Sequence, residues 1–271
     1  MRIALTGSRG FIGSRLKTVL ESQGHEITEW DTQLGKDIHD FQLNDEEYVI
    51  HLAAFADLRA SIGNEDAFWE NNVVPTTRIQ RMCHEAGVPL IYASSSCVHN
   101  WAHSPYGITK KVNEETAMPG QVGLRFSTVY GPNARDSMLI GRLVSGNIKY
   151  LTNHTRDFIH VDDVVAFIVL LMEKDLHTVD KAYDVGTNKG VVVSELGQAV
   201  GYHDLPVEEG DDCEADDNTL DIEPARKLGW EPELKVLDYI TIIIASRALN
   251  SDTVAETTST IKIIDRAAAC E

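Results

Sequence analysis

The chain has 271 residues, of which 43% are apolar, with 24 Lys and Arg against 42 Asp and Glu. This length and mixture suffice for one large domain or two small ones, and they exclude collagen-like, coiled-coil and disordered chains. No apolar run approaches the roughly 20 residues that span a bilayer. The formal net charge of -18 disfavours nucleic acid and anionic membranes as partners, because these polyanions are repelled. A small anion can still bind at one basic spot.

The first residues and the cysteines indicate a reducing compartment. Met1 to Thr6 enter an apolar, strand-like run without a basic and then apolar leader. The cysteines stand at 83, 97, 213 and 270, a spacing that fits neither a zinc site nor a disulfide framework. His99 and His103 have a metal-like spacing but no further ligand in the right pattern. We therefore expect a soluble, cytoplasmic protein without a metal centre.

Short apolar runs alternate with segments of helical periodicity along the first half of the chain. The predicted strands are 2–6, 26–30, 48–52, 89–94 and 121–126. The predicted helices are 11–22, 66–86 and 106–116, in which apolar residues recur three and four positions apart. This alternation is typical of βαβ units around a parallel sheet. The first half therefore predicts a doubly wound, Rossmann-type α/β domain.

The spacing loosens after Gly131 and Pro132. The pattern then predicts a helix at 137–145, a short strand, a helix at 162–173, a strand at 182–185, a helix at 193–200 and an acidic loop at 208–217. We expect a dinucleotide-binding domain of residues 1–130 with about 157–185, and a smaller substrate-binding α/β lobe of about 131–156 with 186–249. Residues 250–271 are predicted to form a loose tail.

The first predicted strand ends in a glycine-rich turn that opens the first helix. Gly7 permits a tight turn, Gly10 allows the backbone to approach a phosphate, and Gly13 lets helix and strand pack closely. The helix amino terminus adds unpaired N–H groups and a partial positive charge. The turn therefore predicts a dinucleotide site. Its contacts are expected from Gly7, Arg9, Gly10, Phe11, Ile12 and Gly13.

Asp31 and Arg9 bear on which dinucleotide binds. Asp31 ends the second strand about 18 residues past Gly13, where a carboxylate accepts hydrogen bonds from both adenosine ribose hydroxyls. The same carboxylate repels a 2′-phosphate, so Asp31 favours NAD. Arg9 lies inside the turn and is able to pair with a 2′-phosphate, which leaves NADP open.

A serine run and a Tyr-x-x-x-Lys pair suggest acid–base chemistry. Tyr106 and Lys110 are four residues apart and therefore lie on one helix face. An ammonium beside a phenol lowers the pKa of the phenol, which predicts that Tyr106 acts as an acid or base near neutral pH. A serine from the 94–96 run, at the end of a strand, is expected to bond the oxygen whose proton Tyr106 handles.

Together these motifs resemble the extended short-chain dehydrogenase/reductases, in particular the NAD-dependent nucleotide-sugar epimerase/dehydratase family, whose type member is UDP-galactose 4-epimerase. The similarity extends over about residues 1–240. Beside the glycine turn, the matching segments are 37–38, 51–54, 72–73, 94–96, 104–110, 124–126, 129–132, 156–164, 183–186 and 225–230.

The resemblance implies a role for individual residues. Tyr106 is the implied catalytic base, Lys110 its partner and Ser95 the catalytic hydroxyl, with Ser96 as the second choice. Further cofactor contacts are implied for Asp37, Ile38, Leu52, Ala53, Ala54 and Asn72. Substrate contacts are implied for Ser95, Ser96, Thr128 and Arg156, with Arg156 on the pyrophosphate of a nucleotide sugar. A homodimer joined through helices 66–86 and 106–116 is also implied.

The implied activity is epimerisation through transient oxidation. Tyr106 takes a proton from a sugar hydroxyl while hydride passes to the nicotinamide, and the ketone is then reduced on its other face. Ser96 and Cys97 stand where family dehydratases carry an Asp-Glu pair, so dehydration is disfavoured. Cys97 also resembles the cysteine of GDP-fucose synthases, which leaves an NADP-dependent keto-sugar reductase or epimerase-reductase open. A non-catalytic dinucleotide-binding protein is the other alternative.

Overall fold

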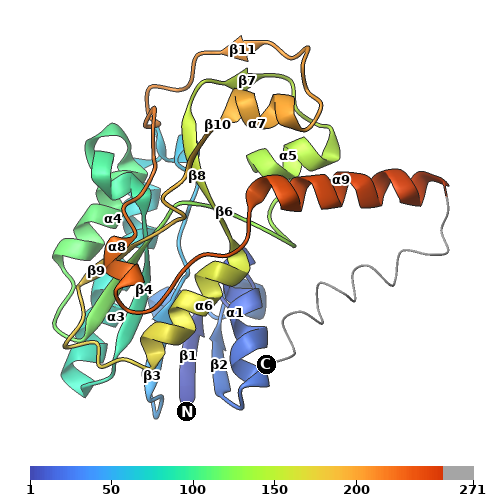
Figure 1. Cartoon of the computed structure of the whole chain (residues 1–271). Helices are drawn as coiled ribbons and strands as arrows, with labels where there is room; N and C mark the ends of the chain where they lie inside the picture. The colour runs from blue at the N-terminus through green and yellow to red at the C-terminus, as the bar shows by residue number, and fades with distance from the viewer. Residues whose placement is uncertain (253–271) are drawn as a thin grey trace.

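The computed structural model describes residues 1–252 and is built around a six-stranded parallel sheet. The strand order is β2-β1-β3-β4-β5-β9 (Figure 1). The strands are β1 (Arg2–Thr6), β2 (Glu26–Trp30), β3 (Tyr48–His51), β4 (Leu90–Ser95), β5 (Gln121–Phe126) and β9 (Ala182–Val185). This architecture confirms the predicted Rossmann-type, doubly wound sheet.

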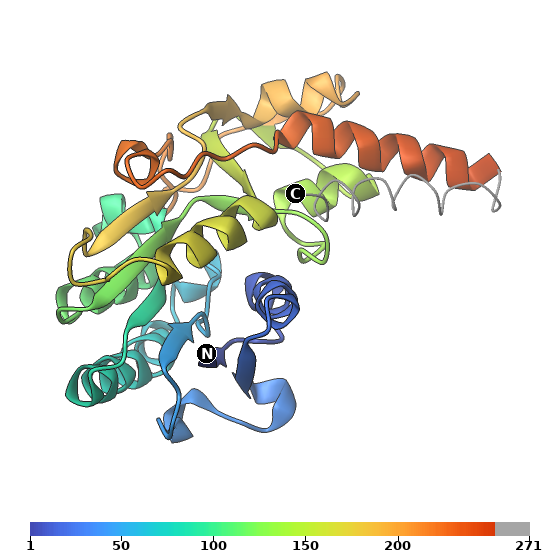
Figure 2. The same cartoon turned by 60° about the horizontal axis from the view of Figure 1, so that its bottom comes forward.

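Helices cover both faces of the sheet, because successive side chains of each strand point to opposite sides. Ile3, Leu5 and Ile50 pack toward α1 (Phe11–Ser22) and α6 (Val161–Met172). Ala4 and Val49 pack on the other face, against Ile79 and Cys83 of α3 (Val74–Ala86). Figure 2 shows α1 and α6 on one side of the sheet and the helices that follow β3 and β4 on the other. The two faces thus contain separate parts of the core.

The predicted helix 66–86 is wrong as one element, because the chain forms two helices there. α2 (Glu65–Asn72) ends before Val73, and α3 begins at Val74 with Pro75 in its first turn. Proline has no N–H to donate and is tolerated in the first turn of a helix but not in its interior. α4 (Pro105–Glu115) starts with a proline as well and is capped by the Ser104 hydroxyl.

A smaller set of elements lies beyond the carboxyl ends of the main strands. Its three-stranded sheet has the order β10-β8-β6. The strands of this region are β6 (Thr128–Tyr130), β7 (Leu151–Thr152), β8 (Thr155–His160), β10 (Gly190–Val192) and β11 (Val207–Glu208). Its helices are α5 (Leu139–Ser145), α7 (Val193–Ala199) and α9 (Val236–Asp252), whereas α8 (Glu223–Arg226) packs against β9 of the main sheet. Tyr130, Leu143 and Phe158 are among the residues of its own core.

α9 is a long helix that the sequence analysis did not predict. Its first half holds the isoleucine-rich run 240–244, and β-branched residues favour strands over helices. Packing of Ile240 and its neighbours on the small core overrides that preference. Of the predicted tail, residues 250–252 belong to α9, and the remainder lies outside the described residues. No helix within residues 1–252 is long and apolar enough to cross a lipid bilayer.

The buried carboxylate of Asp157 connects the small sheet to the segments that border the cavity. It accepts hydrogen bonds from the backbone N–H groups of Thr187, Asn188 and Leu220, at 2.8, 3.1 and 3.2 Å. Burial raises the pKa of Asp157, against the opposing effect of these donors. The neighbouring Arg156 is thereby held at a fixed place on β8, between the two sheets.

Short 3-10 turns fill the connections on the cofactor side. These turns are η1 (Thr32–Leu34), η2 (Ile38–Asp40), η3 (Arg59–Ser61) and η4 (Ser96–His103). β1 pairs with β2 on one side and with β3 on the other, so the chain changes direction across the sheet at β1. Ligands of open α/β sheets bind outside the carboxyl ends of the strands at such a switch point.

Candidate active site

A cavity of about 760 Å³ opens at the carboxyl ends of the main strands. It runs from the glycine turn, past the ends of β3 and β4 and the start of α4, to β6, β8 and the segment 213–220. The predicted site residues that line it are Gly7, Arg9, Gly10, Phe11, Ile12, Gly13, Leu52, Ala54, Ser95, Ser96, Tyr106, Lys110, Thr128 and Arg156. Cofactor-side and substrate-side residues therefore share one space.

The glycine turn is packed too tightly for side chains at two positions. Gly7 has a φ of +69°, and an added Cβ would lie 2.8 Å from the backbone nitrogen of Ala53. A Cβ on Gly13 would lie 2.0 Å from the carbonyl oxygen of Gly7. The start of α1 therefore lies directly against the turn, with its amino terminus bordering the cavity. This geometry fits the pyrophosphate of a dinucleotide.

The side chains of Asp31 and Arg9 have different partners. The Asp31 carboxylate accepts hydrogen bonds from the backbone N–H groups of Arg9 and Gln33, each at 2.9 Å. Each oxygen keeps capacity for a further donor, such as a ribose hydroxyl. The Arg9 guanidinium instead pairs with Glu29 at 2.9 Å, which also binds Lys17 at 2.7 Å. Arg9 is thus already neutralised, which favours a cofactor without a 2′-phosphate.

Five residues implied as cofactor contacts do not line the cavity. They are Asp31, Asp37, Ile38, Ala53 and Asn72. Asp37 caps η2 by accepting from the His39 N–H at 2.9 Å, and Ile38 is buried. Asn72 is fully buried and bonds the N–H and carbonyl of Phe55, at 2.8 and 2.9 Å. It therefore fixes the loop that follows Leu52 and Ala54, which do line the cavity.

The predicted catalytic residues meet in the middle of the cavity. Ser95 ends β4, and its Oγ accepts from the N–H of Cys97 at 3.2 Å. The neighbouring Ser94 hydroxyl donates to Glu114 at 2.6 Å. Ser94 is thus engaged by another partner, and Ser95 remains the hydroxyl that contacts Tyr106.

Tyr106 and Lys110 are both buried, with exposed fractions of 7% and 2%. The Lys110 ammonium lies 5.8 Å from the centre of the Tyr106 ring and donates to the carbonyl of Ala93 at 2.8 Å. Burial raises the pKa of the Tyr106 phenol, although Ser95 and Arg135 oppose this shift. Burial also lowers the pKa of Lys110 to about 8. The predicted lowering of the phenol pKa by Lys110 is therefore wrong for this chain without ligands, because the cost of burying a charge dominates.

Cys97 lines the cavity beside these residues. Burial raises the pKa of its thiol, while the contact with Ser95 opposes the shift. A thiol with a raised pKa stays protonated near neutral pH and is a weak base. The structure thus gives Cys97 a place in the site without activating it.

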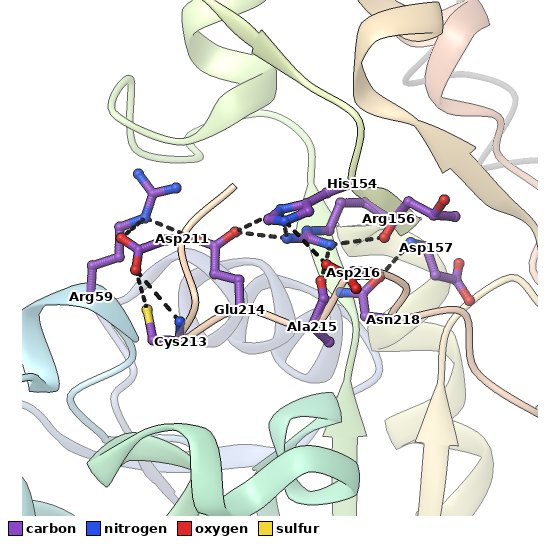
Figure 3. Close-up of polar contacts among 11 residues, drawn as sticks. Arg59, His154, Arg156, Asp157, Asp211, Cys213, Glu214, Ala215, Asp216 and Asn218 are labelled. Carbon is purple, nitrogen blue, oxygen red and sulfur yellow. Dashed lines mark hydrogen bonds and ion pairs between the residues drawn. The ribbon is translucent and has the colours of Figure 1, made fainter. Parts of the chain in front are cut away.

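Arg156 lines the cavity, but its guanidinium is already bonded (Figure 3). Its Nη1 donates to the carbonyls of Thr155 and Ala215, at 2.9 and 2.7 Å. Its Nη2 donates to the carboxylate of Glu214 at 2.7 Å, and Arg59 reaches the same carboxylate at 2.8 Å.

The sequence analysis missed Arg59, Arg135 and Glu214 as site residues. Arg135 lines the cavity, and its charge acts on Tyr106. Arg59 and Glu214 are 155 positions apart and meet through the fold alone, so no spacing in the sequence indicates their contact. His99 lines the cavity too and bonds Asp184 at 2.8 Å.

Comparisons with known proteins find relatives in sequence and in fold. A putative UDP-glucose 4-epimerase of Methanocaldococcus jannaschii is 27% identical, with 89% of this chain and 97% of that protein covered. The protein CapI of Staphylococcus aureus is 29% identical, with 89% of this chain and 96% of that protein covered. The solved structure of MoeE5 with UDP-glucose and NAD superimposes with a TM-score of 0.81 at 27% identity, covering 92% of this chain and all of MoeE5. Residues 3–186 match the model of the NAD dependent epimerase/dehydratase family, and the chain therefore belongs to that family.

Proposed function

We propose that this chain is an NAD-dependent nucleotide-sugar epimerase that acts through transient oxidation of a sugar hydroxyl. The observation that carries the proposal is the shared cavity, in which the glycine turn faces Ser95, Tyr106 and Lys110. A dinucleotide on the turn and a second ligand near Arg156 both border these three side chains. MoeE5, which resembles this chain in fold, is known with UDP-glucose and NAD together.

NAD fits the cofactor end of the cavity. The start of α1 and the close-packed glycines would hold its pyrophosphate, and Asp31, whose two oxygens each accept one backbone N–H, would accept from the ribose hydroxyls. The pairing of Arg9 with Glu29 gives no advantage to NADP. NAD bound there would supply the hydride acceptor and donor that transient oxidation needs.

The side chains around the sugar handle its proton. Ser95 orients the reacting hydroxyl, and Tyr106 accepts its proton as hydride leaves the carbon. The form of the pair that accepts this proton has lost one proton and has a phenolate on Tyr106 beside an ammonium on Lys110, which the Ala93 carbonyl holds in place. Tyr106 then returns the proton after the ketone has been reduced on its other face.

A nucleotide diphosphate sugar is the proposed substrate. Arg156 supplies positive charge for the diphosphate, and Ser96 and Thr128 line the cavity near the sugar position. Ten residues separate Ser95 from Tyr106, and η4 occupies nearly all of that span. η4 packs closely on the start of α4, because a Cβ on Gly107 would lie 2.8 Å from the carbonyl of Trp101. The raised thiol pKa of Cys97 weighs against the epimerase-reductase alternative.

A panel of UDP-, GDP- and dTDP-sugars tests the activity. Wild type is expected to convert at least one donor to its epimer with NAD present in catalytic amounts. Tyr106→Phe should lose about 10²- to 10⁴-fold in kcat, the usual contribution of a positioned acid or base. The variant should still bind NAD, as measured by calorimetry. Wild type and variant that are equally inert on every donor would refute the proposal.

A homodimer is part of the same proposal. Exposed apolar side chains cluster on and near α2 and α3, namely Phe55, Ile62, Trp69 and Val74. Burial of such side chains against a second copy supports association. Light scattering should give twice the mass of the chain, and Trp69→Glu should reduce it toward the monomer. A monomeric wild type contradicts this part.

A further inference from the structure

The carboxylate of Glu214 lies among three basic side chains at the substrate end of the cavity. Nε of Arg59 lies 2.8 Å from it, Nη2 of Arg156 2.7 Å, and Nδ1 of His154 3.5 Å. Figure 3 shows the two arginines approaching this carboxylate from opposite sides. Arg156 has a side chain only 11% exposed, and Glu214 one 22% exposed. The Arg156 side of the cluster is therefore largely shielded from solvent, whereas the Arg59 side chain is 46% exposed.

This arrangement has the chemistry of an anion site. Guanidinium groups bind carboxylates and phosphates with the same N–H donors, so one anion can replace the other. The two ends of the Arg156 guanidinium have different partners. Nη1 is held by the Thr155 and Ala215 carbonyls, whereas Nη2 bonds the Glu214 carboxylate and His154. At Arg156 an incoming anion thus needs to replace one side-chain carboxylate and no backbone contact, whereas Arg59 also pairs with Asp211, at 3.7 Å.

We infer that Arg59 and Arg156 form an anion site of which Glu214 is the internal occupant, and that the diphosphate of the substrate displaces it. The class of ligand rests on the proposed function. Arg59, which comes from η3, is the second cation of this site beside Arg156 of β8. The acidic segment 211–217 thereby competes with the substrate for its own binding site.

The backbone of the segment allows this displacement. Thr155 N–H donates to the Asp216 carbonyl at 2.7 Å, and Asp157 N–H donates to the Asn218 side chain at 2.8 Å. These contacts fix the chain just after Glu214 and do not involve its carboxylate. Rotation of the Glu214 side chain therefore suffices to expose the arginines, while the segment stays on β8.

Self-occupation lowers the apparent affinity for anions. The measured dissociation constant equals the intrinsic one divided by the fraction of molecules in which Glu214 has left the site. A diphosphate has enough charge to engage both arginines, whereas a neutral nucleoside gains nothing there. The Glu214 carboxylate thus favours diphosphate ligands, which can displace it, and excludes anions with too little charge to do so.

Glu214→Gln tests this inference by binding of UDP, measured by calorimetry without any turnover. The amide keeps the shape of the side chain and removes its charge, so UDP should bind about tenfold more tightly than to wild type, which corresponds to roughly 1.4 kcal/mol. Asp212→Asn is the matched control. It changes the net charge equally, and Asp212 is exposed and has no ion pair within residues 1–252. The control should bind UDP as wild type does, and uridine should bind all three chains alike.

Equal or weaker binding of UDP by Glu214→Gln, or an equal gain in the Asp212→Asn control, overturns the inference. So does the absence of UDP binding in every chain. Tighter UDP binding without conversion of any sugar refutes the proposed function alone.

Discussion

At the scale of residues, the site depends on the burial of Tyr106 and Lys110. Burial raises the pKa of the phenol and lowers that of the ammonium to about 8, so Lys110 is the first of the two to lose a proton as pH rises. Spacing in the sequence places Tyr106 and Lys110 on one helix face, and the choice of Ser95 within the 94–96 run comes from the family resemblance; the catalytic roles of all three stay predictions. The direction of the phenol shift was not predictable, because it depends on a desolvation that only the packed structure defines.

The pH dependence of turnover follows from these shifts. A pair that has lost one proton can accept the proton of the sugar hydroxyl, so kcat/KM should rise with pH through about 8. Lys110→Met should remove this rise together with most of the activity. Initial rates over roughly pH 6 to 9.5 measure it. A flat wild-type profile over that range contradicts the role given to Lys110.

Burial of Lys110 also has a cost in stability. Its pKa of about 8 in the folded chain lies below the ordinary 10.5, so the unfolded chain binds more protons between these values and stability rises with pH there. Below pH 8 the buried ammonium is destabilising. Lys110→Met should therefore be more stable at pH 7 by about 1 to 2 kcal/mol, after the lost Ala93 contact is subtracted. Melting curves should show this gain shrinking toward pH 10, and a gain that grows with pH contradicts it.

At the scale of elements, local sequence predicts the βα units best where glycine or proline fixes the backbone. The glycine turn and α1 were predictable because Gly7, Gly10 and Gly13 each have a local reason. The break at Val73 was not predicted, because Pro75 lies within a stretch whose apolar residues keep a helical spacing. The helix α9 was not predicted either, because packing on the small core overrides the preference of its β-branched residues for strands.

Two glycines of the turn are expected to respond differently to alanine. Gly13→Ala places a Cβ 2.0 Å from a backbone oxygen, so it should destabilise the fold by about 2 kcal/mol or more. Gly10→Ala meets the same oxygen at 3.1 Å with a φ of -72°, so its loss of stability should stay within about 1 kcal/mol. It should mainly weaken NAD binding, because it lies where the phosphate approaches. Denaturant unfolding and NAD titration separate the two effects, and equal losses of stability would contradict the packing described.

At the scale of the whole molecule, Arg59 and Arg156 bring two positive charges to one place in a chain whose net charge is -18. Arg156 was predictable as a basic spot because its motif matches the family pattern. Its pairing with Glu214, and the approach of Arg59 from a distant part of the chain, could not be read from sequence because they depend on how the small sheet lies against the main one. The same fold places the cofactor turn and the acidic segment at opposite ends of one cavity.

Epimerisation in deuterated water tests transient oxidation by Tyr106 and NAD most directly. Hydride that leaves the sugar carbon and returns from the nicotinamide never exchanges with solvent, so the product of the most rapidly converted UDP-sugar should carry no deuterium at the inverted carbon. The NADH absorbance should not rise in proportion to product. Deuterium at the inverted carbon, or stoichiometric consumption of a reduced nicotinamide, would instead indicate enolisation or net reduction and contradict the proposed epimerase mechanism.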